Sequence, residues 1–316
     1  MTRQATPGPS IGIDLGATHI RAAIIDTAGT TTAAIHRKLP DDIPGRRLAA
    51  TAIATELLRA HPNDRIESIG LAVAGTVTAG VLTWSANLCL DGINYQSELH
   101  AATGCPVVVI NDARAAALAE SQLGAGSGMT TGTVFVVTVG TGIGGGIVID
   151  GQLRTGTGHG GEIGHIPLDP KGPPCRCGQR GCWERLSGGT ALNAAAAREA
   201  AVNPRGATGR TVAGGQPGAA ALAHAAATGD RRAQYIIHHH AHLFARGLDV
   251  LCAVIAPHLL VLGGGIIARP GAIRDAYLSA ADTLHWHRGQ TRTAMLDDNA
   301  GMIGAVLAAR NSMPSL

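Results

Sequence analysis

Residues Ser10 to Asp26 read SIGIDLGATHIRAAIID, an apolar run, a glycine-centred turn and a second apolar run. Apolar runs on either side of a tight turn predict two strands joined by a short loop. The stretch Val134 to Asp150, VFVVTVGTGIGGGIVID, repeats the pattern, and superposing Gly16 on Gly140 aligns the two stretches from end to end. Because one copy opens each half of the chain, the sequence indicates a duplicated domain.

The two loops carry groups that suit a nucleotide phosphate. The first loop offers a carboxylate, backbone N–H groups and a hydroxyl, a set that also suits Mg2+. The second is so rich in glycine that no Cβ atoms shield its N–H groups. The candidate residues are Asp14, Gly16, Thr18, Gly140, Thr141 and Gly142. Purely structural turns are the alternative interpretation, since glycine turns are common between strands.

Residues 160–189, GGEIGHIPLDPKGPPCRCGQRGCWERLSGG, contain the spacing H-x9-C-x-C-x4-C at His165, Cys175, Cys177 and Cys182. Three thiolates and one imidazole suit a closed, tetrahedral Zn2+ site. A segment so rich in glycine and proline cannot form a core alone, so a structural metal would stabilise it. The alternatives are loop cysteines that cluster without a metal, and a catalytic zinc, which would need an open coordination position.

The motifs GGEIGH and CRCGQRGCWE resemble the signature of the ROK family, which groups bacterial sugar kinases with sugar-responsive repressors. The resemblance implies that Glu162, His165 and Glu184 contact a sugar. His165 would then have two roles, one ring nitrogen binding zinc and the other facing the sugar.

The paired hairpins resemble those of the actin-like ATPase (ribonuclease H-like) fold. This resemblance implies an α/β fold with two domains and a central cleft. The N-terminal sugar and phosphate domain would span residues 1–123 together with a C-terminal helix at about 299–316. The C-terminal nucleotide-binding domain would span 124–298 and carry the zinc knot.

Residues 106–120, PVVVINDARAAALAE, predict a buried strand followed by an alanine-rich helix, with Asn111 and Asp112 at the junction. The local interpretation of Asp112 is a helix N-cap. The segment also resembles the family's E-N-D-A-N-A-A-A, which implies that Asp112 accepts the proton of the reacting hydroxyl and Asn111 binds its neighbour. Ile110 replaces the family's Glu, and Arg114 replaces its second Asn. A helix N-terminus favours an ionised carboxylate, so both roles of Asp112 are compatible.

Three further segments resemble the family pattern. Residues 74–76 resemble its sugar-side loop. TWSANLCL at 83–90 resembles P-N-L-G-W, which makes Asn87 a sugar contact, although Ala86 replaces the Pro and Cys89-Leu90 replace the Gly-Trp. A strand at 259–262 runs into a triple glycine that resembles the adenosine motif. The candidate adenosine-binding residues are Gly263 and Gly264.

Apolar periodicity predicts helices at 45–59, 190–201, 219–227, 231–250 and 299–310. Residues 203–218, rich in Gly, Pro and Thr, predict a mobile loop. The histidines at 238, 239, 240 and 242 could suggest a metal site, but they lack carboxylate partners, so we interpret them as a solvated helix face.

The composition excludes several classes. The 316 residues are 45% hydrophobic and carry a formal net charge of +3, which allows sizeable cores and argues against a nucleic-acid partner. The sequence contains neither a signal peptide nor a membrane span, so a cytoplasmic location is expected. Buried free thiols at Cys89, Cys105 and Cys252 would agree with a reducing compartment.

We therefore expect ATP-dependent phosphorylation of a hexose-type sugar at its 6-hydroxyl, with ATP, Mg2+ and structural Zn2+, by a homodimer. Glucose or an aminohexose such as glucosamine or kanosamine is the expected substrate, because Glu162 and Glu184 would favour an amino group. The alternatives are an N-acylhexosamine kinase acting on N-acetylmannosamine or N-acetylglucosamine, and a non-catalytic sugar-sensing regulator. A repressor would need an N-terminal helix-turn-helix, for which the strand beginning near Ser10 leaves no space.

Overall fold

The structure is a computed structural model that describes residues 8–85, 87–216 and 218–312. The chain forms two compact units. The first contains the chain up to Thr131, with Gly146–Gly161 and the segment from Asp298 onward. The second contains Gly132–Gly145 and Glu162–Asp297. The domain boundaries predicted from the sequence, at residues 123 and 299, stay a prediction.

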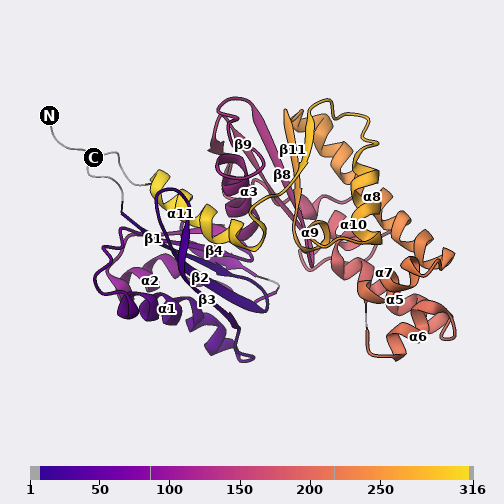
Figure 1. Ribbon diagram of the computed structural model, residues 1–316, viewed down its shortest axis with the longest axis horizontal. Coiled ribbons are helices and arrows are strands. Elements are labelled where there is room, and N and C mark those ends of the chain that lie inside the picture. Colours follow the sequence, from indigo (N-terminus) through magenta and orange to yellow (C-terminus); the bar gives the residue numbers. More distant parts are fainter. Residues whose placement is uncertain (1–7, 86, 217, 313–316) are drawn as a thin grey trace. The chain divides into compact units, whose positions relative to one another are not determined.

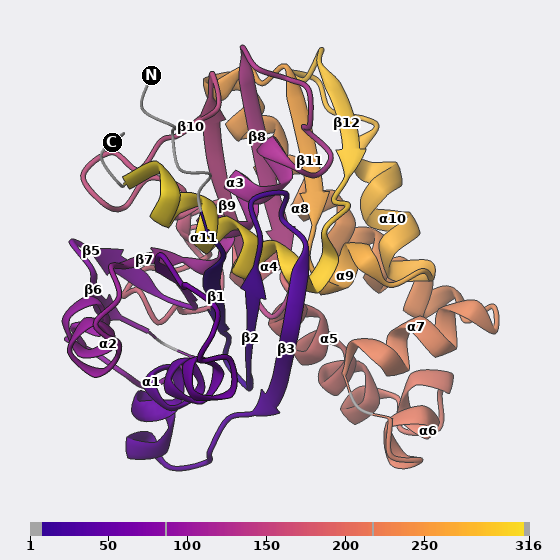
Figure 2. The same cartoon turned by 60° about the vertical axis from the view of Figure 1, so that its left-hand side comes forward.

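Two five-stranded sheets share one strand order, as the sequence repeat predicts (Figures 1 and 2). The first has the order β3-β2-β1-β4-β7, with bounds Ser10–Leu15 (β1), His19–Ile25 (β2), Thr31–Lys38 (β3), Ile69–Val73 (β4) and Val107–Asn111 (β7). The second has the order β10-β9-β8-β11-β12, with bounds Thr133–Val139 (β8), Ile143–Ile149 (β9), Gln152–Leu153 (β10), Leu259–Gly263 (β11) and Gln290–Thr293 (β12). The hairpins β1–β2 and β8–β9 occupy matching positions, so the predicted duplication is confirmed.

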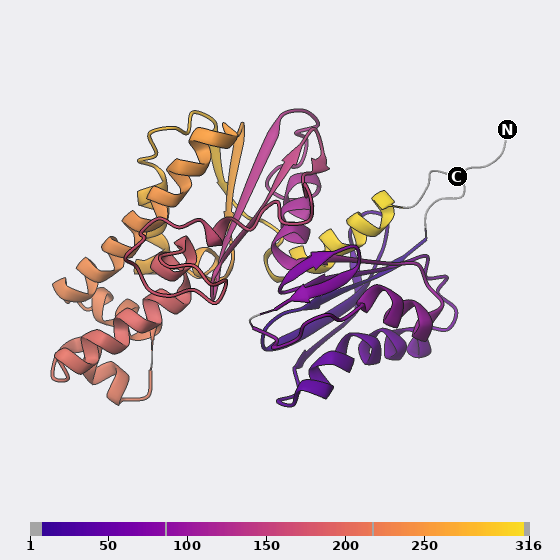
Figure 3. The same cartoon turned by 180° about the vertical axis from the view of Figure 1, so that it is seen from behind.

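Both faces of the first sheet are covered, because successive side chains of a strand point to opposite faces. In β7, Val109 packs in the large cluster that includes α1 and α2, whereas Ile110 packs in a second cluster with α3 and α11. These helices have the bounds Ile43–Ala60 (α1), Tyr95–Thr103 (α2), Asp112–Gln122 (α3) and Ala300–Ser312 (α11). Figures 1 and 3 show α11 on one face of the sheet and α1 and α2 on the other.

The last helix, α11, packs directly on the first sheet, which confirms the prediction that it returns to the first half of the chain. Gly12 and Gly70 are paired neighbours in β1 and β4. A Cβ atom at Gly12 would lie 2.6 Å from the carbonyl oxygen of Met302, and one at Gly70 would lie 2.2 Å from the carbonyl carbon of Ala305. The two glycines therefore let the backbone of the helix touch the backbone of the sheet.

The second unit carries most of the remaining helices. Their bounds are Trp183–Ser187 (α4), Gly189–Val202 (α5), Ala207–Ala213 (α6), Ala219–Ala227 (α7), Arg231–Ile255 (α8), Gly265–Ala268 (α9) and Ala272–Ala281 (α10). Their aromatic core stacks Trp183 on Phe244, with ring centroids 5.5 Å apart, and Phe244 on Tyr277, at 4.9 Å. The Tyr277 hydroxyl donates to the carbonyl of Ser187 at 2.6 Å, so the polar end of this buried ring has a partner.

One local prediction was wrong and two were wrong in part. Residues 203–218 are not one irregular loop, because they contain α6, whose Thr208 is buried. The histidines at 238, 239 and 242 are exposed as predicted. His240 is buried, and its Nδ1 lies 2.6 Å from the carbonyl oxygen of Leu186. All three free thiols were expected to be buried. Cys252 is buried, but Cys105 is half-buried and Cys89 is exposed.

Several elements carried no usable sequence signal. The edge strand β12 is exposed along its whole length and reads QTRT, so no apolar alternation marks it. The hairpin of β5 (Thr76–Thr78) and β6 (Val81–Trp84) is too short to be periodic. Among the described residues, no helix is both long enough and apolar enough to cross a bilayer.

We expect Gly304→Ala to destabilise the protein. Helix propensity alone would make this change stabilising by about 1 kcal/mol. However, a Cβ atom at Gly304 would lie 1.7 Å from the carbonyl oxygen of Ala115 in α3. Overpacking of this kind costs about 1–3 kcal/mol. Urea denaturation would measure the loss, with Gly265→Ala as the control, since a Cβ there meets open space. A Gly304→Ala variant at least as stable as the parent would contradict this account of α11.

Candidate active site

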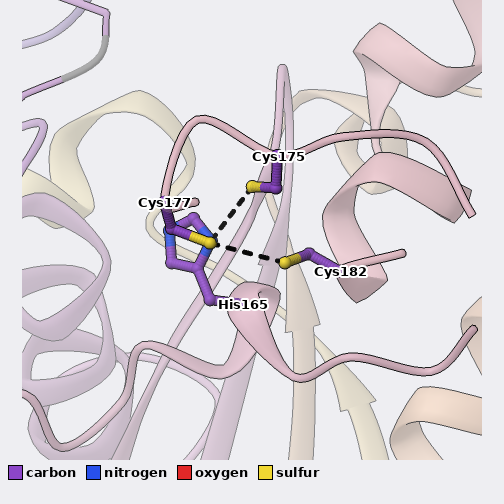
Figure 4. A group of neighbouring side chains, drawn as sticks. All are labelled: His165, Cys175, Cys177 and Cys182. Atoms are coloured by element: carbon purple, nitrogen blue, oxygen red, sulfur yellow. Dashed lines mark hydrogen bonds between the residues drawn. The ribbon is translucent and has the colours of Figure 1, made fainter. Parts of the chain in front are cut away.

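Four side chains of the second unit form a candidate metal centre, the set that the sequence spacing predicts. His165 ends the 3₁₀ helix η1 (Ile163–His165), and Cys182 caps the start of α4. Cys175 and Cys177 lie on the loop between them. The ligand atoms of all four lie within 4.8 Å of one another. Figure 4 shows the three sulfur atoms and the imidazole converging on one point.

The distances fit a tetrahedral metal. With Zn–S bonds of about 2.3 Å, neighbouring sulfur ligands lie about 3.8 Å apart. Cys177 Sγ lies 3.5 Å from Cys182 Sγ, and Cys175 Sγ lies 3.5 Å from His165 Nδ1. In the absence of a cation, burial raises the pKa of the Cys175 and Cys182 thiols. A bound divalent cation reverses this by stabilising the thiolates, so the donor set is one that a metal would complete.

Glu184 connects this metal centre to the second glycine loop. Its Oε1 lies 3.8 Å from His165 Nδ1 and 3.6 Å from Cys175 Sγ. A Cβ atom at Gly142 would lie only 2.2 Å from the other oxygen of this carboxylate, Oε2. Any side chain at Gly142 would therefore displace the Glu184 carboxylate. The other acidic candidate, Glu162, immediately precedes η1 and so lies on the same turn as His165.

The second glycine loop is held by its carbonyl groups. The carbonyl of Gly140 accepts from the N–H of Gly189 at 2.8 Å, and that of Thr141 accepts from the N–H of Thr190 at 2.9 Å. Because a trans peptide unit is planar, the N–H groups of Thr141 and Gly142 point away from these partners. Two successive N–H groups on the opposite side of the loop can bind an anion.

The adenosine-motif glycines lie beside this loop. Gly263 is the last residue of β11, and Gly264 has a φ of 84°. A Cβ atom at Gly264 would lie 2.6 Å from the backbone nitrogen of Val139, the last residue of β8. Because β8 leads directly into Gly140, the predicted nucleotide residues of the second unit lie at one end of one sheet.

In the first unit, the N-cap of α3 is Asn111 rather than Asp112. The side-chain oxygen of Asn111 accepts from the N–H of Arg114 at 3.0 Å. Asp112 is the first helical residue and is half-buried, and its Oδ1 accepts from the N–H of Ala113 at 2.9 Å and from Asn111 Nδ2 at 3.0 Å. The local interpretation of Asp112 as a cap was therefore wrong, because its neighbour takes that role.

The loop that follows β4 accepts hydrogen bonds from the two segments that carry Asn111 and Asn87, the sugar-side candidates of the first unit. Asn111 Nδ2 donates to the carbonyl of Gly75 at 3.0 Å. The hydroxyl of Ser85 donates to the carbonyl of Ala74 at 2.5 Å and accepts from the N–H of Leu88 at 3.2 Å. Ser85 thereby fixes the turn that exposes Asn87. The replaced proline position, Ala86, lies outside the described residues.

Ser85 was missed by the sequence reasoning. The only available signal was its place at the end of an apolar run, immediately before the motif that contains Asn87. Its partners, Ala74 and Leu88, are backbone groups, so no pattern of side chains pointed to them.

The first glycine loop centres on Asp14. The β1–β2 register pairs Asp14 with Arg21, and their side chains lie 3.5 Å apart. Arg21 also contacts Asp298 at 2.9 Å. Burial raises the pKa of Asp14 to about 6, although Arg21 opposes the shift. Arg21 was missed by the sequence reasoning, and only the hairpin register could have indicated it.

Gly16 and Thr18 complete this loop. The N–H of Gly16 donates to the carbonyl of His19 at 3.0 Å, and the carbonyl of Thr18 accepts from the N–H of Leu39 at 2.8 Å. The Thr18 hydroxyl lies 2.9 Å from His19 Nδ1. The three candidates of this loop, Asp14, Gly16 and Thr18, therefore lie on one tight turn at the end of the first sheet.

The chain is similar to known proteins along almost its whole length. The sequence pattern of the ROK family matches residues 10–312. Identity is 30% with the glucokinase of Streptomyces coelicolor, covering 97% of this chain and 99% of the relative. It is 34% with the N-acetylmannosamine kinase of Escherichia coli O157:H7, covering 95% and 98%. A ROK family glucokinase from Streptomyces griseus, solved in complex with glucose and AMPPNP, superposes with a TM-score of 0.83 at 30% identity, covering 96% of this chain and 100% of that one. The predicted actin-like α/β fold is confirmed.

We expect purified protein to contain one zinc ion per chain, bound by the cluster of Figure 4. Cys177→Ser should lower the zinc content and the melting temperature, because a serine hydroxyl is a far weaker zinc ligand than a thiolate. Elemental analysis and thermal denaturation would measure both. Cys105→Ser, at a thiol outside the cluster, should change neither. Fully stable, freshly purified protein without zinc would rule out a structural metal.

We expect the raised pKa of Asp14 to make the stability of the protein depend on pH. A carboxyl group whose pKa rises from 3.8 to about 6 on folding stabilises the fold fully below pH 3.8, and this contribution is lost as the pH rises through 6. Asp14→Asn should therefore gain stability relative to the parent between pH 4 and pH 8, by up to about 3 kcal/mol. Chemical denaturation at each pH would show this gain. The exposed control Asp41→Asn should show no such gain. If the stability difference between Asp14→Asn and the parent is the same at pH 4 and at pH 8, the buried-acid explanation is refuted.

Proposed function

The chain belongs to the ROK family, and from this premise we propose that it transfers the γ-phosphoryl group of ATP to the 6-hydroxyl of a hexose-type sugar. Kinases of glucose and of N-acetylmannosamine are similar to the chain from end to end, which supports this reaction type. The observation that carries the proposal is the junction of β7 and α3. There Asn111 caps the helix, so the carboxylate of Asp112 is not needed as the cap.

Asp112 is the general base in this proposal. It would accept the proton as the sugar oxygen attacks phosphorus. The donors Ala113 N–H and Asn111 Nδ2 and the N-terminus of α3 all favour the ionised carboxylate. A carboxylate of moderate basicity is adequate, because phosphoryl transfer depends mainly on positioning and charge stabilisation.

The sugar contacts follow the family pattern in this proposal. The first unit would supply Asn87, Asn111 and Asp112, and the second would supply Glu162, His165 and Glu184. Because His165 Nδ1 faces the cysteine cluster, Nε2 is the nitrogen that would face the sugar. Zn2+ bound by the cluster would fix the orientation of this ring and hold Glu184 beside it.

Phosphate binding is assigned to the two glycine loops. The N–H groups of Thr141 and Gly142 would bind phosphate oxygens, and the adenosine would pack on the backbone of Gly263 and Gly264. Asp14, with Thr18 nearby, would hold Mg2+, which neutralises charge on the phosphates when bound. The elevated pKa of Asp14 agrees with a buried carboxylate that gains its cation together with the nucleotide.

The identity of the relatives supports two substrate classes, hexoses with hydroxyl groups only and N-acylhexosamines. A non-catalytic sugar sensor is the less supported alternative, because the chain retains Asp112 and both glycine loops. We further propose a cytoplasmic homodimer, as the family resemblance implies.

Asp112→Asn should abolish phosphorylation while sugar binding persists. Asparagine keeps the shape of the side chain but cannot accept a proton, and loss of a general base costs about 10²–10⁴ in turnover. ADP release in the presence of sugar would report turnover, and calorimetric titration would report binding. The exposed control Asp282→Asn should behave as the parent does. If Asp112→Asn retains more than about a tenth of parental turnover, the base lies elsewhere.

A further inference from the structure

The second unit contains a groove that the proposed reaction does not use. A cavity of about 420 Å³ beside Asn111 and Arg114 in the first unit adjoins the proposed base and belongs to the site already described. The groove of the second unit has a volume of about 300 Å³ and lies between the C-terminal half of α5 and the first turns of α8. This volume is at the lower end of the range of small-molecule sites, about 300–1,000 Å³.

The walls of this groove are largely apolar and flat. Its aliphatic lining residues are Ala195, Val202 and Ile236. Tyr235 also lines it and is 63% exposed, so a large aromatic surface is available. The guanidinium of Arg232 lies 5.8 Å from the centroid of the Tyr235 ring, and the ring of His239 stacks on it at 6.3 Å. Planar groups thus follow one another along α8, and the flat body of a ligand can pack on them.

The groove carries a positive charge that the protein does not neutralise. Among the described residues that line it, only Glu199 is acidic, and its Oε2 accepts from Arg232 Nε at 3.1 Å. Arg198 is exposed and forms no hydrogen bond or ion pair with the described residues. Its guanidinium therefore offers its N–H donors to an anion, and a carboxylate matches them in a bidentate pair.

His240 adds a hydrogen-bond acceptor to the groove. It is 7% exposed, and its Nδ1 lies 2.6 Å from the carbonyl oxygen of Leu186. Because a carbonyl can only accept, Nδ1 carries the proton of this bond. Burial lowers the pKa of His240, which favours the neutral ring and leaves Nε2 as an acceptor. Nε2 forms no hydrogen bond with the described residues, so a hydroxyl group of a ligand would supply its donor.

We propose that the groove between α5 and α8 binds a small hydroxylated aromatic acid and acts as a regulatory site. Arg198 binds the carboxylate, Nε2 of His240 accepts from the hydroxyl, and the ring packs on Tyr235. Charge complementarity favours this occupant over a second copy of the chain. A two-fold contact centred on this groove would bring two Arg198 side chains together.

Two consecutive helices connect the groove to the candidate phosphate site. The first N–H groups of α5 hold the carbonyls of the second glycine loop, and the other end of the same helix lines the groove. His240 binds α4 at Leu186, two residues after Glu184, whose carboxylate borders Gly142. Because packed helices transmit small shifts, a ligand between α5 and α8 should alter the second glycine loop. This coupling, unlike the site itself, rests on the proposed function.

The site is tested by calorimetric titration of the full chain with the three isomers of hydroxybenzoate. We expect at least one isomer to bind with a Kd of about 1 mM or below. Benzoate lacks the hydroxyl and 4-hydroxybenzyl alcohol lacks the charge, so each should bind about fivefold more weakly or less. Glycerol 3-phosphate has an anion and hydroxyls without the flat body and should also bind more weakly. No saturable binding of any isomer, or glycerol 3-phosphate ahead of all three, overturns the proposal.

Variants at two exposed residues locate the binding without endangering the fold. Arg198→Gln should weaken binding of the best isomer by about tenfold or more, and Tyr235→Ala by about fivefold. Arg246→Gln, at an exposed arginine of α8 outside the groove, is the matched control. His240→Asn keeps a donor for Leu186 but does not reach the position of Nε2, so it should bind the isomer and benzoate equally.

Two outcomes of the variants would contradict the site. Unchanged affinity in both Arg198→Gln and Tyr235→Ala would place the bound isomer elsewhere and overturns the proposal. A parent that binds no isomer and a Tyr235→Ala variant that changes its oligomeric state would assign the groove to a second copy instead. Light scattering measures that state.

The regulatory role is tested with AMPPNP, an ATP analogue. Saturation with the best isomer should change the Kd for AMPPNP by about fivefold or more, and AMPPNP should change the affinity for the isomer by the same factor. Arg198→Gln should lose this effect at the same isomer concentration, while its ADP release without the isomer stays parental. An AMPPNP affinity that the isomer does not change overturns the regulatory role. If AMPPNP does not bind at all, the kinase proposal fails, whereas the isomer titrations still decide the site.

Discussion

Direct contact between the backbone of α11 and the backbones of β1 and β4 is the constraint on which the first unit depends. The paired glycines Gly12 and Gly70 make it possible, because any side chain at either position would enter the helix backbone. The same helix places Gly301 beside Asp14, where a Cβ atom would lie 3.1 Å from the carboxyl carbon. A segment nearly three hundred residues away in sequence thus forms one wall of the first glycine loop. The carboxylate of Asp14 is buried because α11 covers it.

In the second unit, the carboxylate of Glu184 connects the candidate metal centre with the second glycine loop. Glu184 contacts His165 and Cys175 of the metal centre with one oxygen and lies against Gly142 with the other. A metal bound there would therefore do more than hold a loop rich in glycine and proline. It would also fix the carboxylate that borders the candidate anion-binding turn.

Asp112 and Asp14, the acidic site candidates of the first unit, differ in their surroundings, and these surroundings favour different charge states. Asp112 lies at a helix N-terminus with two donors on one oxygen, which favours its charged form. Asp14 is buried beside a helix backbone, and burial raises its pKa to about 6 despite the nearby Arg21. In the proposed function, Asp112 would accept a proton from the substrate and Asp14 would gain a cation. The energetic cost of burying Asp14 agrees with the general observation that functional sites are stabilised less than the rest of the fold.

The sequence by itself determined the repeated hairpins, the four candidate metal ligands and the strand-to-helix junction at Asn111 and Asp112, because each depends on residues close together in the chain. Local spacing specifies a turn, a set of thiolates or a helix start without reference to the rest of the molecule. It could not assign the cap of α3 to Asn111, the bond from Ser85 to Ala74, or the ion pair between Arg21 and Asp298, which depend on hydrogen-bond geometry and on contacts between distant segments. Only the tertiary structure brought Ile110 and Arg114 to one cavity wall. They lie on β7 and on α3, which follows it. The cavity forms only because the β5–β6 turn and residues 155–158, from other parts of the sequence, pack beside them.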